Sequence, residues 1–187
     1  MLNKNSVLII LCGLLLTRCA VIKDSPNKDI VKLEITDVKK LNGRFSNHPT
    51  SVERKMEREM SESTSYTLLT LWDQISNFKY VDDKERVQLV TLDFISNRKA
   101  VAKLWDNGKV KETRVIKGKI KDGYFYRRPH FIAIPLVPLV FGYDTYRYRI
   151  GLATDGIIID YKWNYWGFAI AAGSFSKGQT SSRYDKK

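Results

Sequence analysis

Residue types on which most enzymes rely are scarce in this chain. Two cysteines and two histidines occur among its 187 residues, and the histidines, His48 and His130, stand far apart in the sequence. No nucleophile elbow, His-Glu-x-x-His motif, phosphate-binding loop or dinucleotide-binding glycine pattern is present. We therefore expect no catalytic residue, no bound metal and no cofactor. An enzyme is the third hypothesis for this chain, which convergent polar groups with His48 or His130 in a cleft would support.

Long hydrophobic runs are also rare, and the clearest one stands near the N-terminus. Lys4 precedes an apolar run from Val7 to Leu16, which at about ten residues is short for a membrane span of roughly twenty. A positive residue followed by a short apolar run is typical of an export signal. Residues 1–18 therefore predict a signal peptide outside the folded domain.

The residues Leu16-Thr17-Arg18-Cys19 follow this run and resemble the lipobox of bacterial lipoproteins, with Arg18 where that family has a small residue. The resemblance implies that Cys19 is acylated and becomes the mature N-terminus. An uncleaved anchor or a chance cysteine is the alternative. Acyl chains contribute roughly 0.8 kcal/mol per buried CH₂, so acylation anchors a protein without a spanning helix. Because Cys12 would leave with the signal, the mature chain would have no disulfide.

The remaining length suits one domain. Residues 19–29 include the polar stretch Lys23–Asp29 and predict a lipidated tether, because few of its residues are apolar enough to bury. Residues 30–173 predict a single β-barrel-like domain. The polar and basic residues 174–187 predict a disordered tail.

Helical patterns are confined to the first half of the domain, after short strands expected at 30–35 and 40–45. Thr50-Ser51-Val52-Glu53 has the spacing of a capping box. Together with Val52, Met56 and Met60 at four-residue intervals, it predicts a helix over 51–62. A second helical stripe consists of Leu68, Leu71, Trp72 and Ile75.

From Arg86 onward, apolar and polar residues alternate, as in strands with one buried face. Asn107-Gly108 favours a type I′ hairpin turn, which would pair Trp105 with Val110 and Lys103 with Glu112. Asp122-Gly123 predicts a second turn, and 109–121 is then one long strand.

Asp155-Gly156 predicts a further hairpin, with Thr154 opposite Ile157. Its two strands place their apolar residues on one face and polar residues such as Arg149 and Asp160 on the other, the pattern of a sheet packed on one side. The apolar face would carry Leu152, Ile150, Tyr148 and Tyr146 opposite Ile159, Tyr161, Trp163 and Tyr165.

Successive strands with tight turns predict a mainly β fold: an antiparallel up-and-down barrel or a strongly bent sheet, with one or two helices near its N-terminal side. Gly43-Arg44-Phe45 resembles the Gly-x-aromatic start of lipocalin-like barrels. The resemblance implies an apolar ligand inside the barrel, whereas side chains alone also fill a small barrel. The residues that would line the site, or fill the core, are Tyr146, Tyr148, Tyr161, Trp163 and Tyr165.

Positive charge dominates the chain, with a net charge of +12, and much of it lies between Arg98 and Arg128. Such a surface attracts anionic lipid or acidic polymers; the alternative is a solvated strand face whose lysines prevent edge pairing. The residues expected to contact an anionic surface are Lys103, Lys111, Lys117, Lys119, Lys121, Arg127 and Arg128.

The stretch Phe131–Phe141 has no charged residue and contains Pro135 and Pro138. Proline does not donate to a strand ladder, so this is not a central strand throughout. It is either an apolar lid, a loop that enters a bilayer beside the lipid anchor, or a buried connection or proline-kinked edge strand.

Together these features predict a lipid-anchored protein of the bacterial cell envelope, facing the periplasm or the cell surface. The first functional hypothesis is a binding module for an apolar or amphiphilic small ligand. The second is a structural or interaction lipoprotein with a solid barrel, which contacts anionic envelope polymers or a protein partner. Nucleic acid is not an expected partner of an exported protein.

Overall fold

The computed structural model describes residues 22, 25, 28–59, 70–76, 88–134, 140–169 and 172–187. The expected signal peptide, Cys19 and the two prolines of the apolar stretch lie outside these residues. So do the end of the expected helix over 51–62 and Leu68 of the second helical stripe. These predictions stay untested.

The described chain is mainly β, and all of its strand pairs are antiparallel. The strand order is β2-β4-β5-β6-β7-β9-β10-β11-β3, with β1 and β8 also paired to β9. The strands are β1 (Ile30–Val31), β2 (Gly43–Ser46), β3 (Ser51–Glu59), β4 (Gln88–Ser96), β5 (Lys99–Asp106), β6 (Lys109–Lys121), β7 (Tyr124–Arg127), β8 (His130–Ile134), β9 (Val140–Ala153), β10 (Gly156–Ala169) and β11 (Ala172–Asp185).

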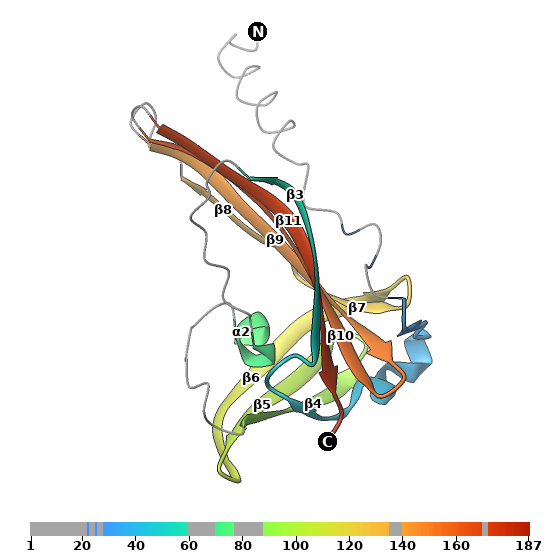
Figure 1. Ribbon diagram of the computed structural model, residues 1–187. Coiled ribbons are helices and arrows are strands. Elements are labelled where there is room, and N and C mark those ends of the chain that lie inside the picture. Colours follow the sequence, from blue (N-terminus) through green and yellow to red (C-terminus); the bar gives the residue numbers. More distant parts are fainter. Residues whose placement is uncertain are drawn as a thin grey trace, which may run out of the picture.

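The sheet bends strongly and does not close into a barrel (Figure 1). Its first strand, β2, meets the C-terminal end of the chain through an isolated bridge between Phe45 and Lys186. The mainly β prediction is therefore confirmed in its bent-sheet form and not as a closed barrel.

Three long strands extend beyond the body of the molecule. β9, β10 and β11 have 14 residues each, and their paired outer halves, flanked by β3 and β8, project as an arm (Figure 1). We call the sheet face that carries Tyr148 and Ile150 toward the core the inner face, and the opposite face the outer face. Because side chains alternate along a strand, each residue of the arm belongs to one of these two faces.

One edge of β9 is shared by three short strands. β1 pairs with β9 at Ala153 and Leu152, β7 pairs with Ile150 and Arg149, and β8 pairs from Tyr146 outward. The chain crosses from β7 to β8 through Arg128 and Pro129. This crossing interrupts the ladder on that edge of β9.

The helix α2 (Leu71–Ser76) lies on the concave side of the bent sheet (Figure 1), and all six of its residues are buried. Asn47 fixes its start: the Asn47 carbonyl accepts from Leu71 N–H and Asn47 Oδ1 accepts from Trp72 N–H, each at 2.8 Å. Trp72 and Ile75 join a core that includes Phe45, Phe94, Phe125, Ile150, Ile157 and Tyr184. A helix and side chains thus occupy the interior.

The helix predicted from the capping-box pattern is wrong, since residues 51–59 form β3. They pair with β11, for example Val52 with Ser182 and Arg54 with Thr180. The local pattern indicates a helix start, but β11 offers backbone partners along β3, with a bulge at Lys177/Gly178. Tertiary pairing therefore overrides local preference here.

The first expected strands are shorter than predicted. Of 30–35 only Ile30–Val31 is a strand, and a 3₁₀ helix, η1 (Ile35–Leu41), follows it. Val38 and Leu41 of this helix are buried in the core. Of 40–45, residues from Gly43 onward are in β2.

The C-terminal residues are not a disordered tail: β11 includes Ala172–Asp185 and lies between β10 and β3. Its inner face carries small residues where β10 carries large aromatic ones, with Gly178 opposite Trp163 and Thr180 opposite Tyr161. The large rings fill the volume that small residues leave open. A strand of this kind lacks the apolar alternation by which sequence identifies strands.

Two of the three predicted Asx-Gly turns are confirmed: Asn107 and Asp122 have φ of 49° and 52°, and Gly108 and Gly123 also have positive φ. Trp105 pairs with Val110 as expected. A bulge at Leu104/Trp105 then shifts the register, so Lys103 faces Thr113 rather than Glu112.

The β9–β10 hairpin turns at Thr154-Asp155, because Ala153 pairs with Gly156 and Leu152 with Ile157. The predicted register is wrong by two residues. An even shift leaves every side chain on its predicted face. Gly156 serves packing rather than the turn, since a Cβ there would lie 2.2 Å from the Tyr184 carbonyl oxygen.

The outer face of this hairpin is not simply solvated. Arg149 and Asp160 are 3% and 0% exposed and form an ion pair with Nε–Oδ2 at 2.7 Å. Ser25 Oγ donates to Asp160 Oδ1 at 2.9 Å, and Ile22 is buried. Ser25 of the expected tether therefore contacts the sheet.

Candidate functional site

Four of the five predicted aromatic residues form one cluster on the inner face of β9 and β10. Tyr148 stacks on Tyr161 with ring centroids 5.0 Å apart, and Tyr161 stacks on Trp163 at 5.4 Å. Tyr146 contacts Tyr148 edge-on at 5.6 Å. The rings form a continuous wall at the junction of body and arm.

Tyr165 does not join this cluster. It lies further along the arm opposite Asp144 and is 41% exposed, because the register differs from the predicted one by two residues. Tyr146, by contrast, faces Trp163.

Burial sets the protonation of the aromatic wall. It raises the pKa of Tyr148 well above its ordinary value, and the neighbouring Tyr161 and Tyr146 add to this. Burial also raises the pKa of Tyr146 and Tyr161. These phenols are neutral at physiological pH, so the wall offers apolar ring surface with neutral hydroxyl groups.

Arg127 points inward rather than to the surface. Its Nη1 donates to the carbonyl oxygens of Ile75 at 2.7 Å and Gln74 at 3.1 Å, at the C-terminal end of α2. Its guanidinium carbon lies 5.7 Å from the centre of the Tyr148 ring. Burial lowers the pKa of Arg127, against the opposing effect of Tyr148 and Tyr146, but an arginine stays charged in proteins.

A groove of about 270 Å³ opens beside this guanidinium. We call it the β6–β9 groove, because one wall comes from β6 and the other from β9. Its basic residues are Lys117, Arg127 and Arg128, and its aromatic residues are Tyr146 and Tyr148. The full lining is Val115, Lys117, Arg127, Arg128, Pro129, Tyr146 and Tyr148.

The groove exists because β7 is short. β7 joins β6 to β9 through Gly118–Lys121 on one side and Ile150 and Arg149 on the other. Where β7 ends, Arg128 N–H still bonds the Lys117 carbonyl at 3.4 Å, and the chain then crosses to β8. Among the described residues no ladder joins β6 to β9 beyond this point, so the two strands separate.

The sequence predicted five of the seven groove residues but assigned them to two separate sites. Tyr146 and Tyr148 were expected in a barrel interior, and Lys117, Arg127 and Arg128 on an anionic-contact surface. Val115 and Pro129 were missed. The available signal was Val115 itself, an apolar residue at an outward position of a charged strand, where it is 51% exposed.

The other predicted basic residues remain on the surface. Lys103, Lys111, Lys119 and Lys121 are exposed, as are Lys117 and Arg128. Lys103 lies on β5 and the other lysines lie on β6, where every second residue points outward. Together the five lysines form what we call the lysine stripe.

A larger hollow of about 490 Å³ lies at the open edge of the bent sheet. It is lined by Phe45, Leu152 and the β9–β10 turn, with Lys40 and Lys186 at its rim. None of the predicted site residues lines it, and its apolar lining is aliphatic apart from Phe45.

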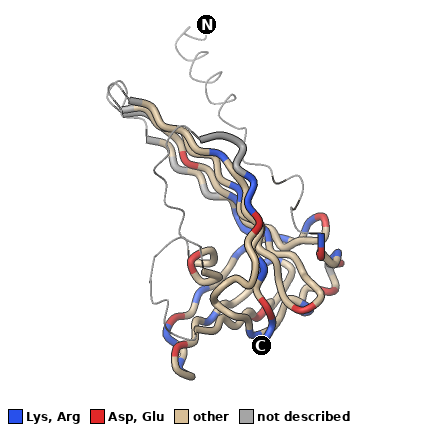
Figure 2. Tube along the Cα trace, in the orientation of Figure 1, with Lys and Arg blue, Asp and Glu red and all other residues tan. Residues whose placement is uncertain are grey.

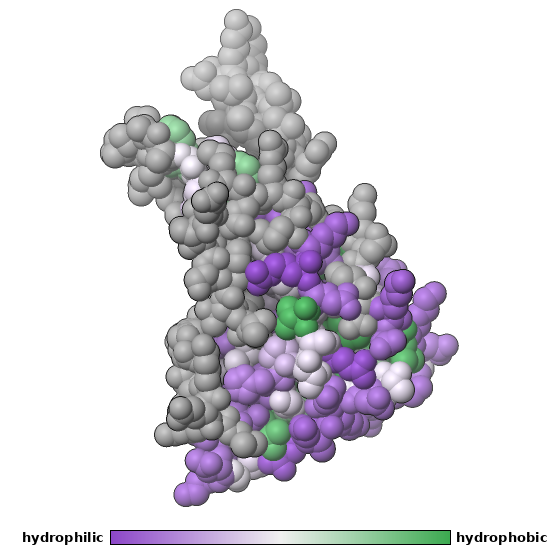
Figure 3. Space-filling view, viewed as in Figure 1, coloured by the Kyte–Doolittle hydropathy of each residue, from purple (hydrophilic) through white to green (hydrophobic). Residues whose placement is uncertain are grey.

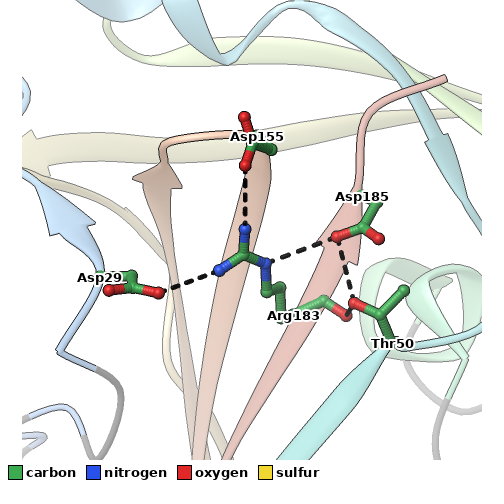
Figure 4. A network of polar contacts seen from close by, with 5 residues as sticks. All are labelled: Asp29, Thr50, Asp155, Arg183 and Asp185. Carbon is green, nitrogen blue, oxygen red and sulfur yellow. Dashed lines mark hydrogen bonds and ion pairs between the residues drawn. The ribbon is translucent and has the colours of Figure 1, made fainter.

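A polar network on the outer face links both ends of the domain (Figure 4). Arg183 Nη1 lies 3.1 Å from Asp29 Oδ2, its Nη2 lies 3.6 Å from Asp155 and its Nε lies 3.4 Å from Asp185. Thr50 Oγ1 donates to Asp185 at 3.2 Å. The carboxylates of Asp29, Asp155 and Asp185 all face the Arg183 guanidinium. The network thereby connects the N-terminal segment, the β9–β10 turn and β11.

Within the described residues no group of three or more His, Cys, Asp and Glu side chains is placed to hold a metal ion. The described part of the chain also contains no helix long and apolar enough to span a membrane. His48 is half-buried and belongs to neither hollow.

The chain matches no protein-family model, no curated protein and no solved structure. Function is therefore inferred from the geometry alone.

Proposed function

We propose that this protein is a membrane-anchored envelope lipoprotein that binds an anionic amphiphile in the β6–β9 groove. The proposal rests on one observation: the groove brings Tyr146 and Tyr148 together with Lys117, Arg127 and Arg128. Such a site matches a ligand with an apolar part and a carboxylate or phosphate. A purely apolar ligand would offer these basic residues no anionic group.

The size of the groove limits the ligand. Small-molecule sites commonly have volumes of about 300–1,000 Å³, and the groove has about 270 Å³. It accommodates a head group and the first part of a chain rather than a whole lipid. This favours partial extraction of an amphiphile, or binding of a short one, over complete enclosure.

The proposed anchor would hold the groove close to the membrane. Cys19 stands three residues before Ile22, which is buried. Three extended residues span at most about 11 Å. An acylated Cys19 would therefore attach the body almost directly to the lipid surface, from which an amphiphile could be taken.

The test is a fluorescence titration of the full chain in nonionic detergent, with dodecanoate and with dodecanol. Trp163 stacks on the aromatic wall and reports binding, and Trp163→Phe identifies its signal. We expect saturable binding of dodecanoate and binding of dodecanol weaker by about tenfold, or 1.4 kcal/mol. Partitioning into the micelle affects all variants alike.

A matched pair of charge reversals locates the site. Lys117→Glu should weaken dodecanoate binding with little effect on dodecanol. Lys121→Glu, on the same outward face of β6 but outside the groove, should change neither. Equal effects of the two substitutions would contradict a groove site.

The lysine stripe supports a second candidate function, contact with an anionic envelope polymer. Lys99 and Lys117 lie directly opposite each other on neighbouring strands, and like charges in that position are unfavourable without an anion nearby. Binding to a polyanion should then weaken steeply with salt. Lys103→Glu with Lys111→Glu should abolish it and leave dodecanoate binding unchanged.

A further inference from the structure

The outer face of the arm changes in character along its length. On β10 the outward residues are Asp160, Lys162, Asn164, Trp166 and Phe168, in that order from the body to the tip. The series begins at a buried carboxylate, continues through a cation and ends with aromatic residues. On β9 and β11 a cation likewise precedes an aromatic residue: Arg147 precedes Tyr143, and Lys177 precedes Phe175.

Three aromatic residues lie side by side across the arm, and we call them the aromatic rung. Trp166 pairs with Tyr143 on β9 and with Phe175 on β11. Tyr143 and Trp166 stack with centroids 6.2 Å apart. Phe168, two residues nearer the tip, is 40% exposed. Phe131 on β8 lies opposite Thr145, one outward position nearer the body than the rung, and is 51% exposed.

Cations lie on the body side of the aromatic rung, and we call them the basic zone: Lys177, Lys162 and Arg147. Lys162 faces Arg147 directly across the strands, an unfavourable pair of like charges. Lys177 pairs with Asn164, one outward position from Trp166. Among the described residues of β8 to β11, no Asp or Glu lies on the outer face between Lys162 and Phe168.

The figures agree with this order. Basic residues lie along the part of the arm nearest the body, and uncharged residues dominate toward its end (Figure 2). In the space-filling view the body is mostly hydrophilic with a few hydrophobic residues, and hydrophobic residues are also visible on the described part of the arm (Figure 3). The sequence that closes the β10–β11 hairpin, from Phe168 to Gly173, contains no polar side chain.

Cations, then Trp and Tyr, then apolar residues is the order in which a membrane surface accepts side chains. Cations bind anionic head groups, Trp and Tyr prefer the interface, and Phe enters the acyl region. We propose that the outer face of the arm docks on an anionic lipid bilayer. The aromatic rung then lies at the interface, and the basic zone lies on the head groups.

The attachment of the N-terminal segment supports the same orientation, and this one step rests on the proposed acylation of Cys19. Ser25 is bound to Asp160 on the outer face of β10. Six residues separate Ser25 from Cys19 and reach at most about 20–22 Å when extended. Six residues of strand also separate Asp160 from Trp166, about 20 Å, so the acyl group can reach the lipid at the level of the aromatic rung.

The experiment uses the full chain in vesicles of phosphatidylglycerol and phosphatidylcholine whose acyl chains carry bromine, a short-range quencher of tryptophan. We expect quenching of the wild type, and loss of most of it in Trp166→Phe. Trp105→Phe is the matched control, because Trp105 lies on the outward face of β5 in the body. Its removal should leave the quenching intact.

Charge variants test the basic zone. Arg147→Gln with Lys162→Gln should reduce quenching in vesicles that contain phosphatidylglycerol. Lys99→Gln with Lys119→Gln, on the body, should not. Circular dichroism verifies that each variant is folded.

Quenching that is unaffected by Trp166→Phe would overturn the proposal, as would unchanged access of Trp166 to aqueous iodide when vesicles are added. A concentration-dependent blue shift of Trp166 without lipid quenching would also overturn it, and would point to a second copy of the chain as the occupant. Dodecanoate binding in the groove is measured without vesicles, so failure of either proposal is distinguishable from failure of the other.

Discussion

Arg149 and Asp160 form a buried ion pair on the outer face of β9 and β10, with Nε–Oδ2 at 2.7 Å. Arg149 Nη1 also donates to the Tyr126 hydroxyl at 3.2 Å, and its guanidinium carbon lies 3.9 Å from the centre of the Tyr124 ring. Burial lowers the pKa of Arg149, but the bond to Tyr126 and the charge of Asp160 outweigh it and raise that pKa. The Arg149 side chain is therefore surrounded by an ion-pair partner, a hydroxyl group and an aromatic ring.

Removing one partner of this pair should be severely destabilising. Asp160→Asn leaves a buried guanidinium without its counter-charge, which costs about 3–5 kcal/mol of unfolding free energy. Urea denaturation of the full chain measures it. The exposed pair Lys40–Asp37 is the control, and Asp37→Asn should cost less than about 1 kcal/mol. Similar losses for the two variants would contradict the assigned burial.

Substitution of Asn47 should also destabilise the fold. Its Nδ2 donates to Gln88 Oε1 at 2.8 Å while its Oδ1 caps α2, and it is 2% exposed. Asn47→Ala leaves buried groups unpaired and should cost about 1–3 kcal/mol. In a double-mutant cycle with Gln88→Ala the two losses should not add. Strict additivity would mean that the two side chains do not interact.

Stability should fall at alkaline pH. Burial raises the pKa of Tyr148, Tyr161 and Tyr184 above the ordinary value of about 10. Below pH 10 these phenols are neutral in both the folded and unfolded chain, so stability is fully present. Above it the unfolded chain loses protons that the folded chain keeps, and each phenol lowers the unfolding free energy by up to about 1.4 kcal/mol per pH unit.

Denaturation at a series of pH values measures this slope, with absorbance reporting phenol ionisation. Tyr184→Phe should reduce the slope by the contribution of one phenol. Ionisation of these three phenols near pH 10 in the folded chain would contradict their assignment as buried groups.

Truncation tests the C-terminal strand. A chain that ends at Gly173 lacks nearly all of β11 and should not fold, because β10 loses one of its two neighbouring strands and β3 loses the strand with which it pairs. Removing Lys186 and Lys187 is the control. It eliminates the bridge to Phe45 and should cost only about 1 kcal/mol. Native circular dichroism of the longer truncation would contradict the sheet order.

Alternation of side chains made much of the sheet predictable. The hairpin faces of β9 and β10 followed from the apolar pattern, and they survived a wrong register because the shift was even. The Asn107-Gly108 and Asp122-Gly123 turns followed from the need for positive φ. These features depend on residues close together in the sequence.

Features that depend on distant partners were not predictable. β11 has small inner residues because Trp163 and Tyr161 fill the space beside them. Its sequence alone therefore resembles that of a polar tail. β3 has a helical pattern but lies at the edge of β11. The groove was missed for the same reason: its basic and aromatic residues were each identified, but their meeting depends on where β7 ends.

The most direct test of the central proposal is photocrosslinking of the full chain with dodecanoate that carries a diazirine on its chain, followed by peptide mass spectrometry. We predict crosslinks to the groove residues Val115, Pro129, Tyr146 and Tyr148, lost in the presence of excess unlabelled dodecanoate. Crosslinks confined to other surfaces, or undiminished by competition, would contradict a binding site in the β6–β9 groove.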